Sequence, residues 1–332
     1  MPQNRPLAHR AAKSLLHLLQ ASLSAANSPA RRSLLDSDSK FMASLLDMRR
    51  RIKSVKNTQQ ITKAMKMVAA AKLKRSQDRV TASRPFAGKM SDVLGGLSGK
   101  VAGEFSHPLL DARGDEKYLI VLISGDKGLA GAFNANVIKA AQAFLTENSA
   151  KQTELIAVGR KGRDYFKRRQ VEIIDEYIGL TSSGQASYAD AQGIANKLID
   201  TFTEDTSIDK VFVIFTEFRT VLSQKPIVQQ LLPIPKAEQS EDTEGGAEAE
   251  YIYEQPAAEI FGRLLPRQIA TQIYRGMLES TASFFGSQMT AMDSASKNAG
   301  ELIDTLTLNM NRIRQAAITK EIIEVVSGAA AA

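Results

Sequence analysis

Apolar residues recur at helical spacing near the start of the chain, from about residue 43 to 98. The first members of this stripe are Leu45, Met48, Ile52 and Val55. Intervals of three and four residues place side chains on one face of an α-helix. The stripe resumes one step out of register with Ile61, Met65 and Val68. We therefore predict a long helix over about 43–98 with a slip in its seam, which the sequences SRPF and GGLSG kink or end.

A second helical tract runs from about 257 to 328. Its seam residues follow a three-four spacing, with Asn309 as the polar member among Met292, Ala295, Ala299, Leu302, Leu306 and Ile313. Two long helices with such seams can bury them against each other as an antiparallel coiled coil. The alternative is that each helix packs on its own domain.

The middle of the chain, about 115–235, has a different period. Short apolar, β-branched runs such as KYLIVLIS and KVFVIFTEF alternate with helical segments such as NANVIKAAQAFLTEN. This alternation predicts a small α/β domain with a largely parallel sheet. The run KPIVQQLLPIP is predicted as the last strand or a sheet edge, because proline cannot donate a ladder hydrogen bond.

Two segments stand apart from these elements. Residues 236–250 are acidic and lack large apolar side chains, which predicts a flexible linker. Residues 1–41 are basic and rich in serine and alanine, which predicts a disordered leader outside the fold. This leader is either an organelle-targeting peptide or a non-native upstream extension, with Met42 as the true start.

Composition excludes several kinds of chemistry. The chain has no cysteine and only three histidines, so disulfides, thiol catalysis and a histidine-rich metal site are excluded. No apolar run reaches the roughly 20 residues that a membrane-spanning helix needs. We expect no metal and no cofactor.

The net charge of +7 is concentrated in the first helix, where the span 49–79 carries many lysines and arginines and only one acid, Asp78. Such a run is compatible with a solvated face, with nucleic acid, or with an acidic protein sleeve. It contains no aromatic residue that could stack on bases, which disfavours single-stranded nucleic acid.

The motif SGDKGLAG, residues 124–131, follows a predicted strand and precedes a helix, where phosphate-binding turns occur. Its glycines have neither dinucleotide-binding nor P-loop spacing. We interpret it as a tight turn with glycines at strained backbone positions. The alternative is an α/β enzyme in which Lys127 binds phosphate.

Several motifs together resemble the gamma subunit of F-type rotary ATP synthases. They are MRRRIKSVKNTQQITKAMKMVAAAKLKRSQDR (48–79), GDKGLAGAFN (125–134), QLLPIP, YIYEQP and RQAAITKEIIEVVSGAAAA (314–332). The match spans about 43–332 in order. The cysteine-bearing regulatory segment of the chloroplast subunit has no counterpart here.

The resemblance implies a non-catalytic rotor shaft, made of the two terminal helices, inside a ring of alpha and beta subunits. The foot of this shaft, the region that includes Tyr251 and Glu254, would contact the epsilon subunit and the c-ring. Torque carried by the shaft would couple proton transport to ATP synthesis or hydrolysis. The implied location is peripheral, on the cytoplasmic face of a bacterial plasma membrane, or on the matrix side of the mitochondrial inner membrane if 1–41 is a transit peptide. The alternative function is a basic coiled-coil protein that binds nucleic acid.

The resemblance also implies partner contacts. Those with the beta subunit fall on Met65, Lys66, Arg314, Gln315, Thr319 and Glu321. Those near epsilon and the c-ring fall on Tyr251 and Glu254. Arg314 would pair with a beta-subunit carboxylate, and Glu321 would accept hydrogen bonds in the same contact.

Overall fold

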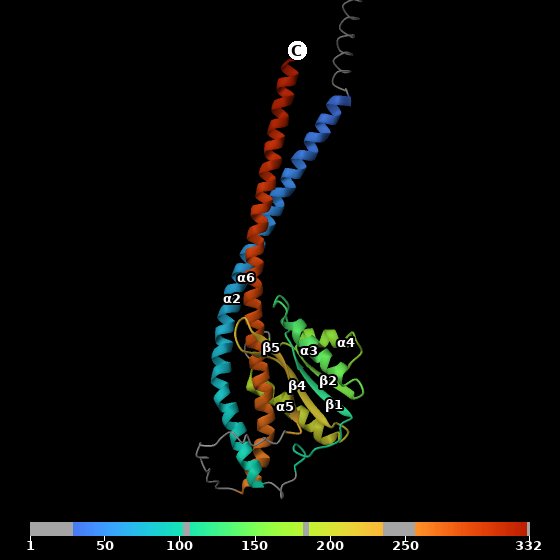
Figure 1. Cartoon of the computed structure of the whole chain (residues 1–332), viewed down its shortest axis with the longest axis vertical. Helices are drawn as coiled ribbons and strands as arrows, with labels where there is room; N and C mark the ends of the chain where they lie inside the picture. Colours follow the sequence, from blue (N-terminus) through green and yellow to red (C-terminus); the bar gives the residue numbers. More distant parts are fainter. Residues whose placement is uncertain (1–28, 102–106, 182–185, 235–255, 331–332) are drawn as a thin grey trace, which may run out of the picture. The chain divides into compact units, whose positions relative to one another are not determined.

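Within the described residues, two long helices near the ends of the chain accompany a five-stranded sheet and three shorter helices (Figure 1). The structure, a computed structural model, describes residues 29–101, 107–181, 186–234 and 256–330. The chain divides into two units: Met1–Ile61 with Ser296–Ala332, here the coil unit, and Thr62–Ala295, here the sheet unit. The predicted acidic linker, 236–250, and the first part of the predicted leader lie outside the described residues.

The sheet belongs to the sheet unit and has the order β3-β2-β1-β4-β5. Its strands are β1 Lys117–Ile123, β2 Gln152–Val158, β3 Glu172–Tyr177, β4 Lys210–Phe218 and β5 Gln224–Leu232. All neighbours are parallel except β4 and β5, which are antiparallel. The predicted α/β class, with a largely parallel sheet and the proline-containing strand at an edge, is therefore confirmed.

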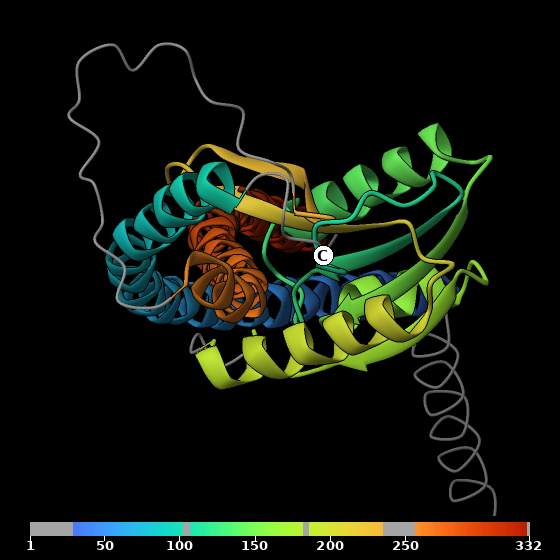
Figure 2. The same cartoon turned by 90° about the horizontal axis from the view of Figure 1, so that it is seen from below.

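Helices cover both faces of this sheet. Strand β1 is buried from Tyr118 to Ile123, and its side chains alternate between the faces. Ile120 and Leu122 pack with residues of α3 (Phe133–Glu147) and α4 (Arg160–Lys167). Leu119 and Val121 pack with residues of α5 (Tyr188–Glu204) and of the long helix α6 (Ala257–Ala330). Figure 2 shows α3 and α5 on opposite sides of the sheet.

The N-terminal helix, α2, spans Pro29–Val101, longer than predicted at both ends. The predicted disordered leader is wrong from Pro29 onward, because proline at the first helical position followed by alanine, arginine and leucine favours a helix. SRPF does not end the helix, which continues through Pro85. GGLSG does mark its end, since α2 stops two residues later.

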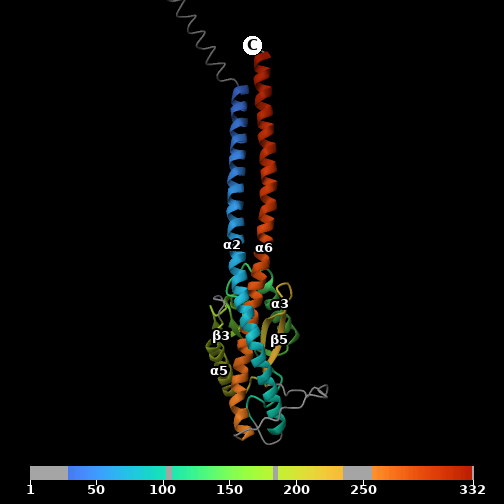
Figure 3. The same cartoon turned by 90° about the vertical axis from the view of Figure 1, so that its left-hand side faces the viewer.

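In the sheet unit, α2 and α6 lie side by side (Figures 1 and 3). The predicted seam of α2 is wrong at Ile61 and Val68, which are 59% and 58% exposed, whereas its member Met65 is half-buried. The buried residues lie on a neighbouring stripe: Thr62, Ala69, Leu73, Ser76 and Val80. Thr62, Ala69 and Ser76 are small, so the positions of large apolar side chains in the sequence do not mark this stripe.

In the coil unit, the Gln59 side chain donates to the carbonyl oxygen of Ser296 at 3.3 Å, which pairs the two helices. Ala299 is buried, and Leu306 and Ile313 are half-buried, as predicted. Leu302 and Asn309 are exposed, and their neighbours Ile303 and Met310 are half-buried instead. The predicted polar position in the seam is therefore wrong by one residue, because the spacing alternates as four-three rather than three-four over this stretch.

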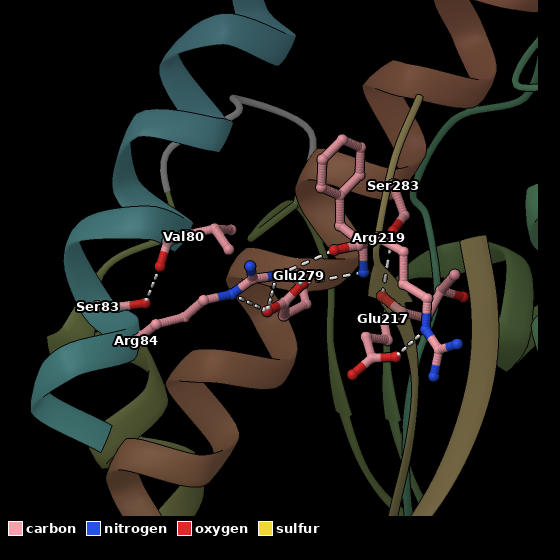
Figure 4. Close-up of polar contacts among 9 residues, drawn as sticks. Val80, Ser83, Arg84, Glu217, Arg219, Glu279 and Ser283 are labelled. Atoms are coloured by element: carbon pink, nitrogen blue, oxygen red, sulfur yellow. Dashed lines mark hydrogen bonds and ion pairs between the residues drawn. The ribbon is translucent and has the colours of Figure 1, made fainter. Parts of the chain in front are cut away.

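Side chains of α6 complete the hydrogen bonding of β4 where its neighbour β1 ends. The β1–β4 pairing stops at Ile214, but β4 continues to Phe218. Ser280 Oγ accepts from the Thr216 N–H at 3.2 Å, and Ser283 Oγ donates to the Thr216 carbonyl at 3.2 Å. Glu279 Oε2 then accepts from the Phe218 N–H at 2.9 Å (Figure 4). The helix thus takes the place of a missing strand.

Candidate partner-contact surfaces

The last turns of α6, in the coil unit, carry an exposed aliphatic surface. Its members are Ile318, Ile322, Ile323, Val325 and Val326, each between 48% and 71% exposed. Residues 322–326 are apolar on more than one face of the helix, and such a helix is normally buried. An exposed apolar patch of this kind is typical of an interaction surface. Sequence reasoning missed these residues, although the run IIEVV was a readable signal.

Polar residues of the predicted beta-subunit contact flank this surface. Arg314, Gln315, Thr319 and Glu321 are all exposed. Arg314 and Glu321 are seven residues apart and share a helix face, as do Gln315 and Thr319 at a spacing of four. The Thr319 hydroxyl donates to the Gln315 carbonyl at 2.9 Å. These side chains are therefore available to a partner and lie beside an apolar surface.

Met65 and Lys66 belong to the sheet unit, so the six predicted beta-contact residues divide between the two units. Met65 is half-buried. Lys66 Nζ lies 2.6 Å from Asp293 Oδ1 on α6, with both side chains partly exposed. Beside them, Met67 is 62% exposed and was not predicted to be functional. Tyr251 and Glu254, the predicted contacts of the foot, lie outside the described residues.

The glycine motif at the carboxyl end of β1 binds the protein's own backbone. The first amides of α4 donate to the motif: Arg160 N to Asp126 Oδ1 at 3.2 Å, Lys161 N to the Gly125 carbonyl at 3.1 Å, and Gly162 N to Ser124 Oγ at 2.9 Å. An anion at the start of α4 would need these same amides. The contacts support the turn interpretation, because the motif holds the start of α4 in place.

Asp126 is the centre of this turn. Its carboxylate also accepts from the Gly179 N–H at 3.0 Å and from the Thr181 hydroxyl at 3.0 Å, so it ties together the loops that follow β1, β2 and β3. Lys127 beside it is exposed.

The prediction of strained glycines in this motif is correct only for Gly131, which has φ +53°. Leu129 also has a positive φ, +61°, although it is not glycine. At Gly125 the constraint is space, because a Cβ atom would lie 2.9 Å from Asn134 Oδ1.

Charged groups cluster at the opposite, amino end of the sheet. Lys117 Nζ lies 2.7 Å from Glu154 Oε1 and 3.0 Å from Asp205 Oδ2. Hydrogen bonds from Ser207 and Lys117 lower the pKa of Asp205 to about 2. Hydrogen bonds from Lys151, Lys210 and Tyr118 likewise hold the pKa of Asp115 well below its usual value. These charged side chains lie at strand ends and pair with one another, so their arrangement does not require a bound ligand.

The described part of the chain offers little scope for metal binding or a membrane-spanning helix. Among its residues, histidine and acidic side chains form no group of three or more that could hold a metal ion. None of its helices combines the length and apolar character required to span a membrane.

Comparison with known proteins identifies the family. Residues 44–332 match the profile of the ATP synthase family. The ATP synthase gamma chain of Solibacter usitatus is 51% identical over 294 residues, which cover 88% of this chain and all of that protein. The ATP synthase gamma chain of Pelotomaculum thermopropionicum is 47% identical and covers 87% of this chain and 99% of its own length.

Solved structures show the same fold. The central stalk and c-ring structure of the Tetrahymena thermophila mitochondrial ATP synthase contains a chain with TM-score 0.55 and 25% identity, covering 71% of this chain and 99% of that one. The rotor of the Euglena gracilis mitochondrial ATP synthase gives TM-score 0.58 at 17% identity, covering 83% and 99%. These findings favour the stalk interpretation over nucleic-acid binding. The chain belongs to the gamma-chain family of the ATP synthases.

Proposed function

We propose that this chain is the central rotor shaft of an F-type ATP synthase. It transmits torque between a proton-driven c-ring and a catalytic ring of alpha and beta subunits, and so couples proton transport to ATP synthesis or hydrolysis. Its own contribution is mechanical, and catalysis belongs to the ring. The observation that carries the proposal is the exposed aliphatic surface at the end of a 74-residue helix, in a chain of the gamma family.

A rotating shaft needs a partner surface that binds without one deep anchor. The aliphatic residues from Ile318 to Val326 suit an apolar surface of the alpha/beta ring that surrounds the helix and lets it rotate. Arg314 and Glu321 make charge-assisted contacts with the beta subunit at particular rotational positions of the shaft. Gln315 and Thr319 contact the beta subunit beside them. Met65 and Lys66 supply a further contact with the beta subunit.

The proposal extends to the foot and to the location of the complex. Tyr251 and Glu254 contact the epsilon subunit and the c-ring. The chain is peripheral to the bacterial plasma membrane on its cytoplasmic face. If residues 1–41 are a transit peptide, the location is the matrix side of the mitochondrial inner membrane, and mass spectrometry of the native N-terminus decides between these.

Co-purification tests the proposal. The tagged full chain is expected to recover an ATPase-active alpha/beta assembly whose hydrolysis drives proton pumping. A chain lacking residues 314–332 is expected to lose that coupling. Intact coupling in the truncated chain would contradict the assigned contact.

Single substitutions sharpen this test. Arg314→Ala removes one proposed charge contact, and truncating a desolvated contact costs about 2–5 kcal/mol. We therefore expect a drop of tenfold or more in coupled turnover, since about 1.4 kcal/mol corresponds to a factor of ten. Arg312→Ala is the matched control, because it removes the same exposed side chain type from another face of the helix. Equal losses in both variants would refute a specific contact at Arg314.

A further inference from the structure

One residue of α2 joins three separate elements of the sheet unit. Arg84 donates from Nε and Nη2 to Glu279 Oε1 on α6, at 3.3 and 3.1 Å. Its Nη2 also donates to the Phe218 carbonyl on β4, at 3.0 Å. Glu279 accepts from the Phe218 N–H at the same time. Figure 4 shows this contact, the Arg84 clamp, between α2 and α6.

The Arg84 clamp is costly for what it contributes to stability. The Glu279 side chain is 1% exposed, whereas that of Arg84 is 51% exposed. Burying a carboxylate is expensive, and well-packed apolar residues often stabilise a protein as much as an ion pair does. What the pair adds is geometry, because a guanidinium that binds a carboxylate and a carbonyl together accepts one arrangement of the three elements.

The clamp lies where α2 most needs an added constraint. Pro85 follows Arg84 and has no N–H, so one backbone hydrogen bond of the helix is missing there. The buried residues of α2 include the small Ala69, Ser76 and Ala87 among larger ones such as Val80 and Met90, so parts of this face carry only shallow ridges. Shallow ridges resist sliding of one helix along another less than deep ones.

Torque applied to a pair of packed helices produces a force that tends to slide one helix along the other. If the chain is a rotor shaft, as proposed above, torque that enters through the sheet unit must reach both α2 and α6. Side chains of α6 bond the backbone of β4 at three positions, through Glu279, Ser280 and Ser283. Arg84 extends that tie to α2.

We propose that Arg84 is a positioning residue for torque transmission, which, with Glu279, fixes the register of α2 on α6 and on β4 under load. This inference rests on the proposed function. It concerns contacts inside the chain and is separate from the partner contacts at the end of α6.

The main test is the double variant Arg84→Met with Glu279→Met. It removes both charges and leaves apolar side chains of suitable size, so no carboxylate is left buried and unpaired. Lys89→Met is the matched control, since it removes an exposed cation five residues along α2 whose nearest acid, Asp92, is 3.8 Å away and also exposed. Arg84→Lys is a second variant, which keeps the charge but cannot form the fork.

Register is measured by the distance between spin labels. The chain has no cysteine, so Asp78→Cys on α2 and Arg267→Cys on α6, both exposed, can be labelled before assembly into the complex. One narrow distance distribution is expected in the parent chain and in Lys89→Met. The double variant is expected to broaden it, or shift it by about 5 Å, one helical turn. Arg84→Lys is expected to lie between the two.

Coupling is measured in the same complexes. In the double variant, ATP hydrolysis is expected to persist, while protons pumped per ATP fall several-fold. An unchanged distance distribution would overturn the register role. A changed distribution with unchanged pumping would overturn the link to torque. Absence of pumping in the parent complex would instead refute the proposed function, so the two failures can be distinguished.

Discussion

A Cβ atom on Gly159 would lie 2.2 Å from the carbonyl oxygen of Ser124, far inside van der Waals contact. Gly159 also has φ +101°, a conformation that other residues rarely adopt. It stands between β2 and α4, where the loop that follows β1 crosses directly over it. The close approach lets Ser124 bond both the end of β2 and the start of α4.

Gly159→Ala is therefore expected to destabilise the chain by about 4 kcal/mol or more, because both a steric clash and a strained backbone must be accommodated. Gly179→Ala is the matched control: Gly179 has φ +91°, but its Cβ would meet nothing within 4 Å. Backbone strain alone is expected to cost about 1–2 kcal/mol. Denaturant unfolding of both variants measures the difference, and equal losses would show that the clash is relieved.

Arg84→Met alone is expected to cost more than the double variant with Glu279→Met. The single change leaves the Glu279 carboxylate buried without its cation. The double change removes that charge and loses in addition only the acceptor of the Phe218 N–H, a smaller cost than an unpaired buried charge. We expect a loss of about 2 kcal/mol, below the roughly 3–5 kcal/mol typical of a fully buried pair, because Arg84 is half exposed. Thermal unfolding of the three chains tests the order, and a double variant less stable than the single one would contradict it.

Acid stability is expected to depend on Asp205. Its folded pKa, about 2, is below the usual 3.8, so the ionised form is favoured in the folded state. That stabilisation is complete above about pH 4 and is lost as the pH falls from about 4 to about 2. Asp205→Asn should therefore lower stability at neutral pH and reduce its loss over this range. Asp200→Asn, which makes the same change at an exposed position on α5, is the matched control.

Asp126→Ala is expected to destabilise the chain by about 1–3 kcal/mol, because it leaves the Arg160 and Gly179 amides and the Thr181 hydroxyl without their acceptor. Lys127→Ala is expected to change neither stability nor inorganic phosphate binding, since Lys127 is exposed at the same turn. Calorimetric titration with phosphate measures the second point. Phosphate binding that disappears with Lys127 would support the enzyme interpretation instead.

The strands were predictable because buried parallel strands are continuous apolar runs, as in KYLIVLIS. Helix α4 was not, since RKGRDYFK is mostly charged and is held by Ser124 and Asp126 of another loop. The seam of α6 was predicted to within one residue. Leu302 and Ile303 are both apolar, so spacing alone could not say which one faces α2.

The Arg84 clamp could not be predicted at all. Arg84 and Glu279 are 195 positions apart, and nothing in a single sequence pairs a particular arginine with a particular acid. The predicted contact residues near the end of α6 came from motif resemblance, and their exposure agrees with a contact role. That role stays a prediction until a complex is tested.

Rotation of the chain against a fixed ring tests the central claim most directly. A bead can be attached through Lys197→Cys, an exposed position on α5, while the alpha/beta ring is held on a surface. The account predicts that ATP drives the bead in one direction, continuously and only while ATP is hydrolysed. Sustained ATP hydrolysis with a bead that stays still would contradict it.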